Sequence, residues 1–195
     1  MRGQRMRLLA AILLMTGVEL ICTSCGKGRD ANVASQEGKG GGETMRLAST
    51  AFTEGGMIPV RYTGDGEDVS PPLAWSDAPA TTKSFALICD DPDAPRGTWV
   101  HWIVYNLPVS VNSLAEDAPP EETLANGGRH GISDFRKLGY GGPAPPSGTH
   151  RYYFKLYALD TVLDLKPGAT KADLLKAMEG HVLAQAQLMG KYARK

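Results

Sequence analysis

Short apolar runs separated by proline- and glycine-containing turns dominate residues 45–165. Runs of this length, bounded by turn residues, favour strands over helices. We therefore expect a mainly β domain, an antiparallel sandwich with little helix before Lys166. The predicted strands cover residues 45–52, 58–63, 73–76, 84–90, 99–106 and 151–159.

Two of these strands carry histidines among aromatic and aliphatic residues. Side chains two residues apart point to the same face of a strand, so each run predicts which residues lie together. On spacing alone, a histidine in such a run is more often a core residue than a ligand. The predicted faces are Trp99, His101, Ile103 and Tyr105 in one strand, and His150, Tyr152, Phe154 and Leu156 in the other.

Helical periodicity is confined to the C-terminal segment. Apolar residues recur at helical spacing between Leu174 and Met189, and Thr170 with Asp173 resembles a capping box. Gly180 interrupts the pattern, which predicts two helices or one kinked helix. We expect His181 on this helical segment, and His130 in a loop.

The first 24 residues predict an export signal. Three arginines precede the apolar run 8–18, which is shorter than the roughly 20 residues that span a bilayer. Thr-Ser-Cys-Gly at 23–26 resembles a lipoprotein cleavage site before Cys25, which would then carry a lipid anchor. Cys22 is the alternative lipidation site, and an ordinary signal peptide with two incidental cysteines is a third interpretation.

Residues 25–44 differ in composition from residues 45–195. They are polar, glycine-rich and without aromatic residues, so they are predicted to be a flexible tether to a folded domain at 45–195. Removal of residues 1–24 leaves 18 basic and 20 acidic residues. This balance gives no sign of a nucleic-acid partner. The 23 glycines and 13 prolines of the chain favour a turn-rich fold.

One cysteine lies inside the predicted domain. If Cys25 is acylated, Cys89 has no partner for an internal disulfide. Cys89 belongs to the apolar run 84–89, and we expect it to be a buried structural thiol.

Three segments resemble the phosphatidylethanolamine-binding protein family, in its bacterial Raf-kinase-inhibitor-like branch, the YbhB/YbcL type. The segments are 91–102, with Asp-Pro-Asp-Ala-Pro and Trp-Val-His-Trp, 139–152, and 174–181. The resemblance implies a Greek-key sandwich of two antiparallel sheets with peripheral C-terminal helices. It also implies a small surface cavity for phosphate-like anions, with no cofactor and no metal.

The family's cavity residues carry over to seven positions. Two imidazoles and a phenol offer donors to phosphate oxygens, and a glycine permits close approach of the backbone. Asp91 would repel an anion unless it orients an imidazole. Pro95 matches a proline whose preceding peptide bond is often cis, and Ala144 stands where related bacterial sequences often have cysteine. The implied ligand-binding residues are Asp91, Pro95, Trp99, His101, Gly142, His150 and Tyr152.

We therefore expect a non-catalytic module that binds a small phosphorylated or anionic ligand. The predicted lipid anchor would hold it to a membrane of the cell envelope, on the periplasmic side or at the cell surface. One alternative is a protein-interaction module of the protease- or kinase-inhibitor kind, with an unknown partner. Another is a hydrolase or metal site built from Asp91, His101 and His150. The chain lacks Gly-x-Ser-x-Gly and His-Glu-x-x-His, which disfavours that interpretation.

Overall fold

The computed structural model describes residues 44–194. The predicted signal peptide 1–24, both candidate lipidation cysteines, and the predicted tether as far as residue 43 lie outside the described residues. Within 44–194, no helix is both long enough and apolar enough to cross a membrane.

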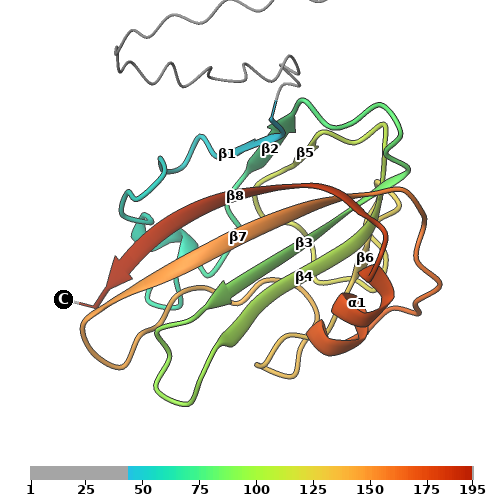
Figure 1. Ribbon diagram of the computed structural model, residues 1–195. Helices are drawn as coiled ribbons and strands as arrows, with labels where there is room; N and C mark the ends of the chain where they lie inside the picture. The colour runs from blue at the N-terminus through green and yellow to red at the C-terminus, as the bar shows by residue number, and fades with distance from the viewer. Residues whose placement is uncertain (1–43, 195) are drawn as a thin grey trace, which may run out of the picture. The chain divides into compact units, whose positions relative to one another are not determined.

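Residues 44–194 form two antiparallel sheets, as predicted. The larger sheet has the order β6 (Arg129–His130), β4 (Trp99–Pro108), β3 (Ser84–Asp91), β7 (Thr149–Leu159) and β8 (Val182–Ala193). The smaller has the order β1 (Arg46–Ala48), β2 (Leu73–Ser76) and β5 (Ser113–Leu114). Figure 1 shows the four long strands of the larger sheet side by side. In this sheet β7 returns to lie beside β3, on the side away from β4, which is a Greek-key order.

The larger sheet is covered on both faces. On one face Leu87 and Phe154 belong to an apolar cluster with Trp75 of the smaller sheet. On the other face Ile88 packs in a cluster with Leu174 of the helix α1 (Lys171–Met178). Burial on both faces explains why β3 has a continuous apolar sequence rather than an alternating one.

The predicted burial of Cys89 is confirmed. The thiol lies in β3, is 1% exposed, and is a free cysteine. Burial raises its pKa well above the ordinary value, with Asp90 and Asp91 adding to the effect. Cys89 therefore contributes packing, and its thiolate is disfavoured.

The strand predicted over 58–63 is wrong. The amide of Ile58 donates to the carbonyl of Lys191, but the chain then enters the short 3₁₀ helix η1 (Val60–Tyr62). Pro59 has no amide hydrogen to continue a ladder and, with φ −58°, leads into the turn. The predicted strand 45–52 is likewise reduced to β1.

The first C-terminal helix is confirmed and the second is wrong. Thr170 and Asp173 form the predicted capping box at the start of α1. Gly180 has φ +76°, and residues 182–193 then form β8, which pairs with β7 over its whole length. Residues 186, 188, 190 and 192 are buried, so this segment fits the alternating pattern of a strand as well as helical spacing. Pairing with β7 decides between the two patterns.

A β-bulge in β4 changes the predicted face of His101. Cys89 pairs with Trp102 and Asp90 pairs with Val100, which leaves His101 as the extra residue. Val100 lies in the cluster beside α1 together with Ile103 and Tyr105. The His101 ring instead meets the ring of Tyr152, on the face toward the smaller sheet, with centroids 5.1 Å apart. The predicted common face with Ile103 and Tyr105 is therefore wrong, because the bulge turns His101 toward Tyr152.

Candidate ligand-binding site

A cavity of about 410 Å³ lies where β3 ends and β4 and β7 begin. It contains every residue assigned to the site from the sequence except Gly142. The loop between β3 and β4 and the loop between β6 and β7 supply the rest of its wall. The lining residues are Asp91, Ala94, Pro95, Arg96, Trp99, His101, Phe135, Ala144, Pro145, Pro146, His150 and Tyr152.

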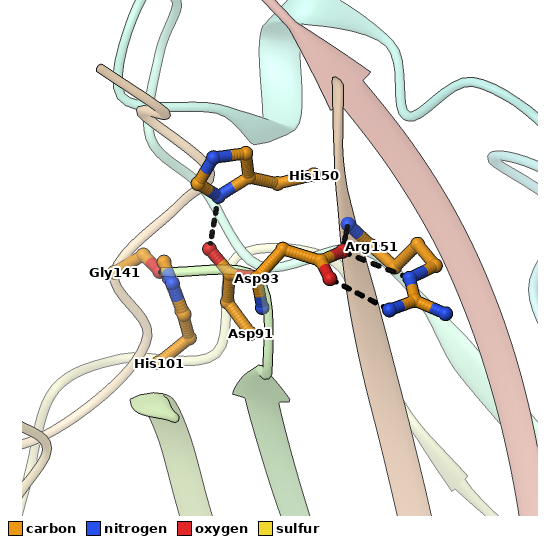
Figure 2. Close-up of polar contacts among 6 residues, drawn as sticks. All are labelled: Asp91, Asp93, His101, Gly141, His150 and Arg151. Carbon is orange, nitrogen blue, oxygen red and sulfur yellow. Dashed lines mark hydrogen bonds and ion pairs between the residues drawn. The ribbon is translucent and has the colours of Figure 1, made fainter. Parts of the chain in front are cut away.

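A buried carboxylate holds one histidine of the cavity. His150 Nδ1 donates to Asp91 Oδ2 at 2.7 Å, and the Asp93 amide donates to Asp91 Oδ1 at 2.8 Å. The two side chains are only 9% and 5% exposed, and Figure 2 shows the imidazole above the carboxylate. Since both carboxylate oxygens are used inside the protein, Asp91 orients His150 and leaves its Nε2 as the nitrogen for a ligand.

The second histidine is held by a carbonyl. His101 Nδ1 lies 2.6 Å from the Gly141 oxygen, and because a carbonyl only accepts, Nδ1 carries the hydrogen (Figure 2). Burial lowers the pKa of His101, against the raising effects of the Gly141 carbonyl and of Asp91. The neutral ring is therefore favoured, with an acceptor lone pair at Nε2. Its edge contacts with Tyr152 and with Phe135, at centroid distances of 5.1 and 5.3 Å, fix its plane.

Tyr152 carries a buried, unpartnered hydroxyl. Its side chain lines the cavity and the residue is 1% exposed, yet its hydroxyl has no hydrogen-bond partner among the described residues. Burial raises the pKa of the phenol, and the charge of Asp91 raises it further. An unsatisfied buried hydroxyl costs about 1–3 kcal/mol, so a ligand oxygen that accepts from it is favoured.

An ion pair fixes the loop that carries Asp91. Arg151 donates to Asp93 through its backbone amide, Nε and Nη2, at 2.9, 2.8 and 2.6 Å. Figure 2 shows the guanidinium turned toward Asp93 rather than toward His150. Arg151 lowers the pKa of Asp93 to about 2. This contact joins the loop after β3 to β7 and so keeps Asp91 opposite His150.

Gly142 lies behind the cavity wall. Its amide donates to Asp68 Oδ1, and a Cβ at this position would lie 2.7 Å from the Thr63 Cα. The glycine thus permits close packing of the loop on Thr63, and it does not line the cavity. The peptide bond before Pro95 is trans, since the described residues contain no cis bond.

The other two histidines lie outside the cavity. His130 is in β6 rather than a loop; its Nε2 accepts from Trp102 Nε1 at 3.1 Å and its Nδ1 donates to the Glu121 carbonyl. His181 follows α1 in a turn and donates to Asp160 Oδ1 at 2.8 Å. Across residues 44–194, no three His, Cys, Asp or Glu side chains are grouped as a metal site requires.

Six residues of the cavity wall were not assigned to the site from the sequence: Ala94, Arg96, Phe135, Ala144, Pro145 and Pro146. Phe135 meets the ring of Trp99 edge-on at 5.5 Å and also contacts His101. Arg96 follows Pro95 at the rim and is exposed. Phe135 lies just before the segment 139–152 and outside it, so the motif did not point to it. For Arg96, the sequence offered one weak indication of a place at the cavity, which is its position next to Pro95.

Comparison with known proteins gives one consistent result. A sequence profile described as phosphatidylethanolamine-binding protein matches residues 48–193. A UPF0098 protein of Methanothermobacter thermautotrophicus is 56% identical over 150 residues, which cover 77% of this chain and 99% of the relative. A UPF0098 protein of Aquifex aeolicus is 49% identical over 157 residues, covering 79% and 91%.

Two solved structures share the fold. A phosphatidylethanolamine-binding protein homologue from Chlamydia trachomatis superposes with a TM-score of 0.73 at 45% identity, covering 78% of this chain and 99% of that one. YbcL from Escherichia coli, described as a member of the mammalian family, gives a TM-score of 0.73 at 33% identity, covering 77% and 99%. The similarity thus spans about three quarters of this chain.

Proposed function

The chain belongs to the phosphatidylethanolamine-binding protein family, and we propose that it is a non-catalytic binding module whose cavity takes a small phosphoryl anion. The observation that carries the proposal is the unpartnered, buried hydroxyl of Tyr152, a residue that lines the same small cavity as the Asp91-supported imidazole of His150. Both groups donate to an anion when His150 is protonated. Asp91 then compensates the positive charge of the imidazolium.

His101 limits which protonation state of the anion fits the cavity. Its Nδ1 is committed to the Gly141 carbonyl, and burial lowers its pKa, so its Nε2 accepts a hydrogen bond rather than donating one. A monoprotonated phosphoryl group offers acceptor oxygens to His150 and Tyr152, and one P–OH donor to His101. The cavity is therefore matched to a monoprotonated phosphate or phosphate monoester rather than to a fully ionised one.

The apolar part of the wall strengthens these contacts. Trp99, Phe135, Pro145 and Pro146 lie around the polar groups. Such a wall excludes water, and hydrogen bonds to a charged group are stronger in the resulting low dielectric. The prolines also hold their loop in one conformation before binding, which reduces the entropy lost on binding.

The composition of the wall supports binding rather than covalent chemistry. None of the described lining residues is a serine, threonine, cysteine or lysine. The hydroxyl present is that of Tyr152, and burial raises its pKa, which makes it a poor nucleophile. The Asp91–His150 pair has the geometry of a base and its orienting group, but none of the described lining residues stands beside it as a serine, threonine or cysteine nucleophile.

The second half of the proposal concerns location. After cleavage of residues 1–24, a lipid on Cys25 would hold the module at a membrane of the cell envelope, with residues 26–44 as the connection. The support is the sequence pattern of the N-terminus. A membrane location would bring the cavity near phosphoryl headgroups as well as free phosphorylated solutes.

Calorimetric titration with inorganic phosphate and phosphoethanolamine tests the proposal. Tyr152→Phe removes the donor but keeps the ring, so affinity should fall by roughly fivefold to tenfold. The same change removes an unsatisfied hydroxyl, so the ligand-free protein should melt at the same or a higher temperature. Tyr153→Phe is the matched control, since Tyr153 neighbours Tyr152 on β7 but does not line the cavity. Equal affinity of all three proteins would contradict the proposal.

A further inference from the structure

A second cavity of about 480 Å³ adjoins the first. Arg96 and Trp99 line both, so the two cavities are neighbours on the domain. The walls differ in character, because the second combines apolar side chains with three cationic ones, from the segments around the start of β4, after β6 and at the start of α1. Its lining residues are Arg96, Trp99, Val100, Ile132, Ser133, Asp134, Arg136, Thr170 and Lys171.

The second cavity has an excess of positive charge. Arg96 and Arg136 make no ion pair within the described part of the chain, in contrast to Arg151, which is paired with Asp93. Lys171 and Lys155 both pair with the carboxylate of Asp90, so these three side chains together carry a net positive charge.

One carboxylate opposes this charge. Asp134 also lines the cavity, and its Oδ2 accepts the Val100 amide at 2.7 Å. This bond commits part of the carboxylate to the backbone of β4. Two unpaired guanidinium groups therefore outweigh one carboxylate that is already hydrogen-bonded.

The arginines rather than the helix end make this cavity suitable for an anion. The side chain of Thr170 accepts from the Asp173 amide, and the Asp173 carboxylate accepts the Thr170 amide, so the start of α1 is already capped. Arg136, by contrast, is presented by a turn in which its amide donates to the Ser133 carbonyl at 2.9 Å. The turn fixes where the side chain starts, which lowers the entropic cost of using it.

From these contacts we infer that the second cavity binds a second anionic group of the same ligand. The ligand is then an elongated molecule, with a phosphoryl group at one end and a phosphate or carboxylate at the other. The inference rests on the proposed function of the first cavity. The phosphoryl end lies with His150 and Tyr152, and the linker passes Trp99 at the junction. Arg136, with Arg96, holds the distal anion, since a guanidinium matches a phosphate or carboxylate in a bidentate fashion.

Matched synthetic ligands test the inference. Hexyl phosphate and hexane-1,6-diol bisphosphate share a chain and differ in the distal phosphate, and four- and eight-carbon pairs vary the reach. Calorimetry at fixed, physiological salt should show the bisphosphate binding roughly tenfold more tightly at one preferred length. Arg136→Gln should abolish this advantage and leave the hexyl phosphate affinity unchanged. Arg46→Gln is the control, because Arg46 is an exposed arginine of β1 outside both cavities.

The outcomes separate this inference from the proposed function. Failure of hexyl phosphate and of inorganic phosphate to bind would overturn the proposed function. Binding of hexyl phosphate with no advantage for any bisphosphate would overturn the second site alone. Equal losses in the Arg136→Gln and Arg46→Gln proteins would also overturn it, since they would reflect the overall charge of the domain and not a contact. The comparison within the wild-type protein stands even if a variant fails to fold.

Discussion

Replacing Asp91 by asparagine separates two opposite roles of this carboxylate. If Asp91 only repels the bound anion, Asp91→Asn tightens binding. The structure predicts the reverse, because Asp91 Oδ2 accepts from His150 Nδ1 at 2.7 Å while Oδ1 accepts the Asp93 amide at 2.8 Å. An asparagine has one acceptor oxygen for these two donors, and its NH₂ group must face one of them. The substitution therefore misorients His150 or removes the charge that stabilises its imidazolium.

The magnitude follows from the bond that is lost. A hydrogen bond to a charged group is worth about 1.5–3 kcal/mol, so Asp91→Asn should weaken phosphate binding by roughly tenfold to a hundredfold. Calorimetry with phosphate and phosphoethanolamine measures the loss.

Two controls make the result specific. Asp160→Asn also removes one negative charge from the domain, but Asp160 pairs with His181 and does not line the cavity. It should therefore change affinity far less. In a His150→Ala background, Asp91→Asn should have little further effect. Tighter binding by the Asp91→Asn protein would refute the orienting role.

Three further predictions concern stability and location. Burial lowers the pKa values of His101 and His130. Below about pH 6.5 the unfolded chain therefore takes up protons that the folded chain does not. The free energy of unfolding, measured in urea, should fall as the pH is lowered from about 6.5. A flat profile would contradict this. Gly142→Ala places a Cβ 2.7 Å from Thr63 Cα and should cost about 1–3 kcal/mol in the same assay. Cys25→Ser should abolish partitioning into detergent; if Cys22→Ser does so instead, the cleavage assignment is wrong.

The strands with strong turn boundaries were predictable from the sequence. Residues 73–76 form β2 as expected, and the runs 84–90, 99–106 and 151–159 differ from β3, β4 and β7 by at most two residues at an end. The capping box at Thr170 likewise located α1. These signals are local, since the turn residues and the cap act on the backbone next to them.

The features that could not be predicted depend on contacts between distant segments. Residues 182–193 carry both a helical and an alternating pattern, and only the pairing with β7 selects the strand. The bulge at His101 is a mismatch of register between β3 and β4, which the period-two pattern of one strand cannot reveal. Phe135 enters the cavity wall because its loop folds back over Trp99.

The most direct test of the phosphoryl-binding cavity is side-chain ¹⁵N NMR of histidine during a phosphate titration. The chain has 4 histidines, so each ring can be assigned by single substitution. On addition of phosphate near pH 7, the His150 signals should move toward those of an imidazolium. His101 should remain neutral with its hydrogen on Nδ1, while the His130 and His181 signals should stay unchanged. Saturating phosphate that leaves the His150 signals where they were would contradict the proposed site.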